Sequence, residues 1–574
     1  MPLTPFSGTL DKKGVAHLLR RATFGASPQQ INSLVGSTPA AIVGQLFNSA
    51  IPDPALPIDP ANGEQWTEIP TPTSKNDDLE DNFLSWYIGQ MLNTSLPYSA
   101  REKIVFFLHT HFTTIRSKVT SAKALYFQNK LYRLFAFDSA NAKLSIKELT
   151  KKVSIDNAMI RLLDGDLNVK GNPNENYARE LLELYSIGRG LDGYIPPVTQ
   201  QGDYANYSET DIQIAARVLS GWEFDDTFTT IDVDTLIPRA NVRGSATNAS
   251  SHDNDTTAPK TFSSHFGGIT IAPDPALLSG GNPTEASAMD ELDQLIEMIY
   301  AQHETAKNIC RKVYRFFVYH DIDDVIDNDI IESMATVFES NNFKLQPLLT
   351  ALFTSEHFYQ AGGGVDDDNF GGIIKSPLDL AIGTLRLFDY QLPDITTATA
   401  DFYAQTSYLL NLIKGDGLNL SQMKMPFFDP TDVAGYEAYH QYPIYNRAWI
   451  TPNHLASRYK FIENLILYNP SAPPLININV YDWVKANISD AIAGDENAIA
   501  FELAKYFFPV PYVDTETNHG LTDARLAYFK SQLIGLHTPG YWATLWAGGA
   551  QEDLRIALNL LFNAMLQTPE YQLL

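Results

Sequence analysis

Apolar side chains recur at helical spacing through most of the chain, which predicts a mainly α-helical protein. In the first part of the chain, helices are predicted at 14–22, 79–92, 100–109, 118–135, 145–152, 175–188 and 209–220. Further along, they are predicted at 286–302, 305–318, 345–354, 376–388, 453–468, 522–535 and 551–567. Strand patterns are limited to 510–515 and to short pieces between 230 and 275. We expect a large multi-helix body with a long irregular insertion and few short strands.

Three helix starts carry sequence signatures of capping. Asn172-Pro173 with Glu175 has the pattern of an N-cap, a proline at the first helical position and a carboxylate at the third. Thr451-Pro452 and Ser376-Pro377 are predicted to open two further helices in a similar way.

Three segments interrupt the helical pattern and suggest how the chain divides. Residues 49–75 are rich in proline and threonine, 223–285 have almost no helical period, and 361–372 are rich in glycine and aspartate. An irregular segment as long as 223–285 is more often functional than idle. We therefore predict helical parts at 1–222, 286–360 and 361–574, with 223–285 as an insertion.

Composition and charge exclude several classes of function. The 574 residues include 41 basic and 67 acidic side chains, for a net charge of −26. A field of that sign repels phosphate backbones, so nucleic acid is not an expected partner. The single cysteine, Cys310, excludes internal disulfides and sites with several thiolate ligands.

Neither a membrane span nor a targeting segment is expected. No run approaches the roughly 18 consecutive apolar residues of a membrane span. The first residues lack the apolar region of a signal peptide, which predicts a cytoplasmic protein, with a periplasmic or exported location as the alternative.

The first candidate site is the histidine pair in FFLHTHFTT. His109 and His111 are two residues apart, so they point apart on a helix and converge only where the helix ends. Thr113 and Thr114 favour such an ending, and two converging imidazoles suit a metal ion. The alternative is one histidine in the core and one at the surface.

The second candidate site is the helix NPNENYARELLELYSIG. Its spacing places Asn176, Glu180 and Glu183 on one face. Arg179 can bridge Glu175 and Glu183, or brace the residues that face a cavity. A carboxylate there could ligate a metal or act as a general base. The alternative is a salt-bridged surface.

The third candidate site lies in the irregular insertion. His252 and Asp253 are followed by Lys260, three residue types that suit acid–base chemistry or recognition of an anionic group. The alternative is a solvated polar loop.

The motifs taken together resemble the DUF1800 family of uncharacterised bacterial proteins. The matching pieces, in family order, are HLLRRATFG, REKIVFFLHTHFTT, NENYARELLELYSIG, YSETDIQIAARVLSGW, PKTF, ICRKVYRFFV and PFFDPTDVAGY, which precedes Trp449. Tyr436 stands where a tryptophan is common. The resemblance implies a helical body and a bacterial source. It also implies a partner among DUF1501-like exported proteins, which are often encoded beside this family.

Two functions follow from these observations as hypotheses. The first is an enzyme, a hydrolase or an oxidoreductase, that depends on a divalent metal held by His109, His111, Glu180 and Glu183. Arg179 would then orient a carboxylate, and His252, Asp253 and Lys260 would act on a small-molecule or glycan substrate. The second is a non-catalytic helical scaffold or partner protein of a DUF1501-like protein. Its docking surface would be formed by seven aromatic side chains, Phe427, Phe428, Tyr436, Tyr439, Tyr442, Tyr445 and Trp449.

Overall fold

The structure is a computed structural model, and it describes residues 3–92, 98–137, 144–198, 200–359, 372–414, 422–466, 475–509 and 521–574. It is 55% helical with 5% strand, which confirms the predicted mainly α-helical fold. The predicted strand at 510–515 and nearly all of the loop at 361–372 lie outside the described residues. The division into four parts stays a prediction.

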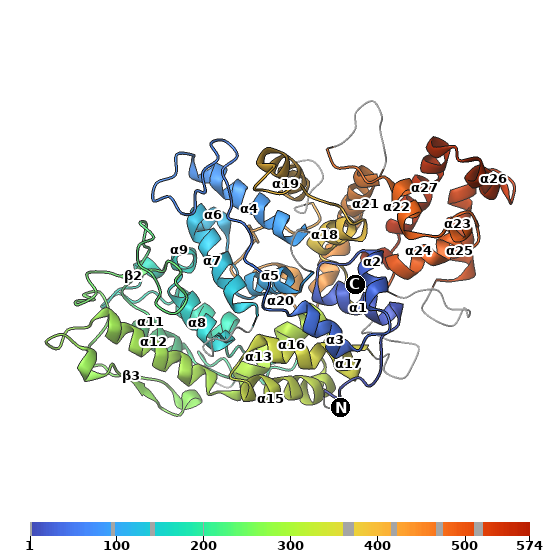
Figure 1. Ribbon diagram of the computed structural model, residues 1–574. Coiled ribbons are helices and arrows are strands. Elements are labelled where there is room, and N and C mark those ends of the chain that lie inside the picture. The colour runs from blue at the N-terminus through green and yellow to red at the C-terminus, as the bar shows by residue number, and fades with distance from the viewer. Residues whose placement is uncertain are drawn as a thin grey trace.

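Helices cover the described chain from end to end (Figure 1). The first group is α1 (Lys12–Ala22), α2 (Pro28–Leu34), α3 (Pro39–Leu46), α4 (Asn76–Leu92), α5 (Arg101–His111), α6 (Arg116–Val119), α7 (Ala122–Phe135), α8 (Ile146–Ser154), α9 (Asn157–Leu162), α10 (Asn176–Glu180) and α11 (Glu209–Val218). The second is α12 (Glu285–Tyr300), α13 (His303–Phe317), α14 (Asp324–Ile326), α15 (Glu332–Ser340), α16 (Leu345–Phe353), α17 (Glu356–Tyr359), α18 (Pro377–Leu387) and α19 (Thr399–Lys414). The third is α20 (Glu437–His440), α21 (Pro452–Ile466), α22 (Val480–Asn487), α23 (Asp490–Ala493), α24 (Ile499–Phe507), α25 (Asp523–Ile534), α26 (Tyr541–Gly548) and α27 (Gln551–Leu566).

The buried apolar side chains form a large cluster that draws on residues from Leu10 to Tyr571. Helix α5 lies in the middle of the molecule in Figure 1, and nine of its 11 residues are buried. Helices α1 to α3 lie between this centre and the C-terminal helices α22 to α27, and α1 contacts α24. The first and last parts of the chain therefore pack together.

The insertion at 223–285 is irregular, as predicted, and carries most of the short strands. Strand β1 (Trp222–Glu223) pairs antiparallel with β2 (Asn241–Val242), and β3 (Lys260–Thr261) pairs antiparallel with β4 (Thr270–Ile271). Each strand is two residues long, so the ladders only hold the insertion in place: β3 and β4 pack against α11 and α12, and β1 packs against α9.

Local chemistry explains why one predicted helix boundary holds and two predictions fail. Ser376 caps α18 and exchanges hydrogen bonds with Asp379, as its sequence predicts. The predicted cap at Asn172 is wrong, because α10 begins at Asn176 and Asn174 accepts a hydrogen bond from the Asn176 amide. The predicted helix at 118–135 is two helices, since Thr120 adopts a left-handed φ of 47° between α6 and α7.

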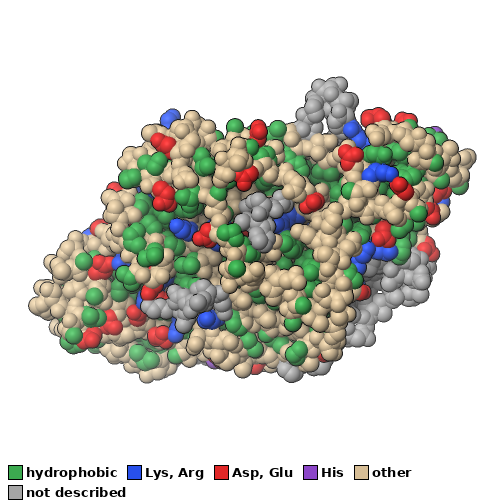
Figure 2. All heavy atoms as spheres, in the orientation of Figure 1, with side chains coloured by type: hydrophobic (Ala, Val, Ile, Leu, Met, Phe, Trp, Pro, Cys, Tyr) green, Lys and Arg blue, Asp and Glu red, His purple; other side chains and the backbone are tan. Residues whose placement is uncertain are grey.

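Acidic and basic side chains are interspersed over the face shown in Figure 2. Within the part of the chain that the structure describes, no helix has the length and apolar character needed to cross a membrane.

Candidate functional site

The second predicted motif contains a change of helix type. Helix α10 continues directly into a π-helical turn at Leu181–Tyr185. Such wide turns are rare and frequently mark functional sites, because they leave carbonyls without their usual helical partners. Here the carbonyls of residues 184–186 accept hydrogen bonds from Lys312 Nζ, from His111 Nε2 at 3.2 Å and from Asn308 Nδ2 at 2.6 Å. Side chains from α5 and α13 thus complete the turn.

A cleft of about 320 Å³ opens beside this turn. Its wall includes segments from α5, the π-helical turn, α13 and α20, with Phe107 and Phe316 as its apolar part. The acidic, basic and imidazole side chains that line it are His111, Glu183, Arg189, Asp192, Lys312, Arg315 and His440. The volume falls in the range of sites for small molecules.

Most of the charged groups of the cleft are held by a partner. Arg315 Nη2 lies 3.1 Å from an Asp192 carboxylate oxygen, which also accepts a hydrogen bond of 3.0 Å from the Tyr445 hydroxyl. Arg189 Nη2 lies 2.7 Å from a Glu183 carboxylate oxygen. Lys312 differs, since among the described residues its Nζ donates a hydrogen bond to a neutral carbonyl on the π-helical turn.

Burial brings the pKa values of two groups near neutral pH: Lys312, which lines the cleft, and Glu180, which directly precedes the π-helical turn. Burial, reinforced by the charge of Glu183, raises the pKa of Glu180 to about 7. Burial, reinforced by Arg315, lowers the pKa of Lys312 to about 8. Glu180 and Lys312 each act on the pKa of the other, so the two charges are near one another. Strongly shifted groups in a cleft are characteristic of functional sites.

The two predicted metal-binding histidines do not converge, although α5 ends at His111. His109 is 1% exposed and stacks on Phe428 with ring centroids 4.0 Å apart. Neither of its ring nitrogens has a hydrogen-bond partner among the described residues, and burial lowers its pKa to about 3. His111 faces the cleft, and its Nε2 must carry the proton because it donates to the Tyr185 carbonyl. Burial also lowers the pKa of His111, so its ring is neutral.

Asn176 and Arg179 lie away from the cleft wall. The exposed Asn176 donates to Asp164 over 3.2 Å. Arg179 pairs with Glu209 at 2.6 Å and with Glu175 at 3.3 Å, rather than with Glu183. The predicted bridge to Glu175 is therefore present, whereas Glu183 pairs with Arg189 instead.

His252 and Lys260 form a buried cluster around a residue that the sequence analysis did not single out, Glu291 on α12. The Glu291 carboxylate lies 2.9 Å from His252 Nε2 and accepts a hydrogen bond from Lys260 Nζ. His252 Nδ1 lies 2.8 Å from the Ser220 carbonyl. Both ring nitrogens of His252 thus lie against oxygen atoms of the protein. All three side chains are buried, so the solvated loop considered as the alternative is wrong here.

Asp253 belongs to the same cluster, and its position shows that this cluster is distant from Arg179. Its carboxylate is 2.7 Å from Arg217 Nε, near the C-terminal end of α11, whereas Arg179 pairs with Glu209 at the start of that helix. Eight residues of helix separate the two ends by about 12 Å. The second and third predicted sites are therefore separate clusters.

The predicted four-residue metal site is not assembled. Within the described ranges, no group of three or more His, Cys, Asp or Glu side chains could hold a metal ion. The physical reason is that His109 packs among aromatic rings while His111 and Glu183 line the cleft.

The predicted aromatic docking surface is mostly interior. The buried members are Phe427, Phe428, Tyr436, Tyr445 and Trp449, while Tyr439 is partly buried and Tyr442 is 50% exposed. That surface is wrong as a prediction, because the rings fill the space around α5 and α13.

The sequence analysis also missed the residues that α13 contributes. Asn308, Lys312 and Arg315 are spaced at i, i+4 and i+7 on a helix whose other face is apolar. This spacing places three polar side chains on one face, and it was visible in Asn308 together with the motif ICRKVYRFFV that follows it.

Comparison with known proteins identifies a family. No curated protein and no solved structure gives a significant match to the chain. The sequence profile of one family, described as "Protein of unknown function (DUF1800)", matches residues 17–573, nearly the whole chain. The chain belongs to the DUF1800 family.

Proposed function

We propose that the cleft beside the π-helical turn is the active site of a hydrolase-type enzyme that transfers protons near neutral pH. The observation that carries the proposal is the turn itself, which directly follows Glu180 and places Glu183 on the cleft wall that Lys312 closes from α13. A turn with a purely structural role does not need a nearby lysine and carboxyl group with pKa values shifted toward neutral pH. Such shifts are instead typical of groups that exchange protons during catalysis.

The two pKa values assign the roles. Between about pH 7 and pH 8, Glu180 is mostly the carboxylate and Lys312 is mostly the ammonium ion. Glu180 therefore serves as the general base that activates water, and Lys312 as the general acid that protonates the leaving group. The rate falls below about pH 7 as Glu180 takes up a proton, and above about pH 8 as Lys312 loses one.

The other residues of the cleft position the substrate. Arg189 and Arg315 are held by Glu183 and Asp192, so their remaining N–H groups are oriented for polar atoms of a ligand. Phe107 and Phe316 supply an apolar surface. We expect a small substrate with at least one hydrogen-bond acceptor.

The dependence on a divalent metal is not part of this proposal, because the residues expected to hold the ion are not together. The scaffold alternative is weakened, because most of the aromatic side chains expected to form its docking surface are buried. Association with a DUF1501-like protein and the cellular compartment stay predictions.

A panel of chromogenic esters, phosphates and glycosides, assayed from pH 5 to pH 10, tests the proposal. We expect a bell-shaped rate profile with limbs near pH 7 and pH 8 for a substrate that is turned over. The substitutions Glu180→Gln and Lys312→Met should each reduce kcat about 10²- to 10⁴-fold, the range for lost acid–base catalysis.

Matched controls come from an exposed pair on α21. Lys460 Nζ lies 2.8 Å from Glu463, and Lys460→Met and Glu463→Gln should leave the rate unchanged. Labelling with an amine-reactive ester, followed by mass spectrometry, checks Lys312 without any substrate. Its labelling rate should reach half its maximum near pH 8, and a midpoint above pH 10 would refute its role.

A further inference from the structure

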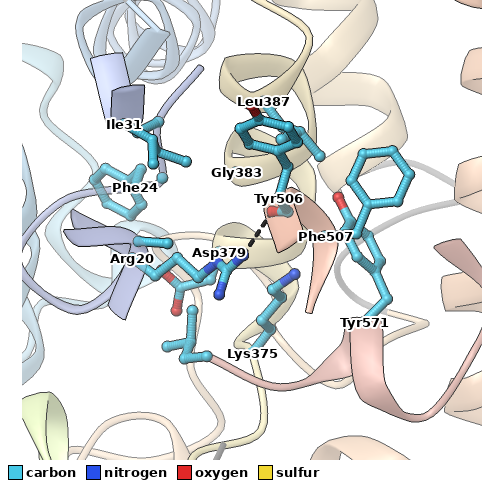
Figure 3. A pocket seen from close by; sticks show the side chains of 14 residues that line it. Arg20, Phe24, Ile31, Lys375, Asp379, Gly383, Leu387, Tyr506, Phe507 and Tyr571 are labelled. Carbon is cyan, nitrogen blue, oxygen red and sulfur yellow. Dashed lines mark hydrogen bonds between the residues drawn. The ribbon is translucent and has the colours of Figure 1, made fainter. Parts of the chain in front are cut away.

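A second cavity lies on the other side of the molecule's centre, where α1 meets α18 and α24. Its volume is about 30 Å³, and its wall includes Arg20, Lys375, Asp379 and Tyr571 (Figure 3). A buried water needs about 10–15 Å³ measured in this way. The cavity therefore has room for two or three waters or for one small ion. We call it the basic chamber.

The Lys375 side chain is the unusual member of the wall. Lys375 is only 6% exposed, and its Nζ lies 3.6 Å from the centroid of the Tyr571 ring. Among the described residues, no hydrogen bond or ion pair of the Lys375 ammonium group is present, so the contact with Tyr571 is its one close polar interaction. A buried ammonium ion without an acceptor is costly, and an anion in the chamber would remove that cost.

Further positive charge surrounds Lys375. Arg20 is 9% exposed and donates to the carbonyls of Tyr506 at 2.5 Å and Phe508 at 3.1 Å. These two bonds fix the plane of its guanidinium group and leave other N–H groups without an acceptor among the described residues. Arg458 is completely buried, and its Nη1 has no partner in the described structure. Both arginines act on the pKa of Lys375, which burial and these charges lower well below its ordinary value.

The available carboxylate is already engaged. Asp379 accepts a hydrogen bond from Lys103 Nζ on one oxygen and a bond of 2.7 Å from the Ser376 hydroxyl on the other. Among the described side chains of the wall, it is the single carboxylate. Arg20 and Lys375 therefore face the chamber as two basic groups that Asp379 does not pair with, and an anion bound there would favour the protonated form of Lys375.

The backbone holds the chamber at this size. Gly25 adopts a φ of +104°, and a Cβ atom there would lie 3.2 Å from the Cα of Gly383. The segment after α1 thus packs directly on α18, which a larger residue would prevent. Figure 3 shows Arg20 from α1 and Lys375 from the segment before α18 reaching toward the strip of backbone at Tyr506.

We propose that the basic chamber binds one tetrahedral oxyanion of the size of inorganic phosphate, held by Lys375 and Arg20. The anion joins the two cations through charge-assisted hydrogen bonds and fits the volume of the chamber. It also links α1 to α18 at the place where the first and last parts of the chain meet. The chamber is separate from the proposed active site, so the two proposals fail independently.

Equilibrium dialysis of the full chain with radiolabelled inorganic phosphate at low ionic strength tests this site. We expect saturable binding of one phosphate per chain. Lys375→Met keeps the apolar stem against Tyr571 but removes the charge, and it should weaken binding at least about 10-fold. Lys460→Met, at an exposed lysine, should bind phosphate as the wild-type chain does.

Competition distinguishes a free anion from the end of a larger molecule. If only a free oxyanion fits, sulfate displaces the labelled phosphate and glycerol 3-phosphate does not. If glycerol 3-phosphate competes equally well, the chamber receives a phosphate ester, and an anion limited to the size of inorganic phosphate is contradicted.

A second measurement does not depend on any variant folding. Crystals of the wild-type protein soaked in sodium selenate should show an anomalous peak between Lys375 Nζ and the Arg20 guanidinium group. A chamber that holds only water in selenate, or phosphate binding that Lys375→Met leaves unchanged, would overturn the proposal.

Discussion

The cleft cluster and the His252 cluster contain the same kinds of side chain but differ in what surrounds them. In the cleft, Lys312 donates to a neutral carbonyl and forms no ion pair with another described residue. In the insertion, Lys260 and His252 both meet the Glu291 carboxylate, and all three are buried. In the cleft, a lysine without a counter-charge lies beside a cavity. In the insertion, the basic side chains are paired with a buried carboxylate.

This difference teaches that residue types alone do not separate a catalytic site from a structural one. A buried charge that has found its counter-charge holds an element in place. A lysine that lacks one, next to a carboxyl group and an open volume, remains available for a substrate. The following substitutions test whether the two clusters really differ in this way.

The largest effect should come from Glu291→Gln. Removing this charge leaves Lys260 and His252 buried without their common partner, which should lower the free energy of unfolding by about 3–5 kcal/mol. Urea unfolding followed by circular dichroism measures the loss. Glu297→Gln, on the exposed face of the same helix and paired with Lys147 at 2.7 Å, should change it by less than about 1 kcal/mol.

Equal, small losses for Glu291→Gln and Glu297→Gln would show that the insertion does not depend on the buried cluster. The His252 cluster would then again be a candidate for acid–base catalysis.

A smaller effect of opposite sign is expected for Glu180→Gln in the cleft. Glu180 has an ordinary pKa of 4.5 and a folded-state pKa of about 7, so the folded protein binds more protons than the unfolded chain between these values. Stability therefore falls as the pH rises through this window and stays reduced above it. Because Glu180 is partly exposed, we expect the variant to be more stable than wild type by about 1–2 kcal/mol at pH 8.

Thermal unfolding at pH 5 and pH 8 measures this linkage, and most of the gain should disappear at the lower pH. Glu463→Gln reports the effect of removing an exposed carboxylate under the same conditions. A gain that is the same at both pH values would contradict a raised pKa for Glu180.

The fold was largely predictable because helical periodicity is a local property of the sequence. Each of the 14 predicted helical segments contains helix in the structure, and the irregular insertion lies where the period is lost. Several helices were not predicted, among them α2, α3, α15, α19 and α24, and two boundary errors occur where neighbouring side chains compete for the same local hydrogen bonds. Asn174 rather than Asn172 binds the amide that opens α10, and Ser121 starts a new helix after Thr120.

The site was less predictable because its decisive contacts join distant segments. Glu180 and Glu183 could be placed on one helix face, but the π-helical turn and its Lys312 cap come from packing against α13. Similarly, Glu291 lies 31 residues after Lys260, and nothing local marks the pairing. The choice of partner for Arg179 depended in the same way on where α11 packs.

The smallest effect is expected for His109→Phe. This variant tests whether His109 is a packed core residue or a metal ligand. Both ring nitrogens are buried without partners among the described residues, and an unsatisfied buried polar group costs about 1–3 kcal/mol. Phenylalanine keeps the stacking on Phe428 but adds volume to a filled core, so a net gain of about 1 kcal/mol is expected in urea unfolding. His111→Phe is the matched variant, and it should instead destabilise the protein because the Tyr185 carbonyl loses its donor. Elemental analysis completes the test: a stoichiometric metal in the wild type that His109→Phe loses would return this histidine to a metal site, despite the aromatic rings around it.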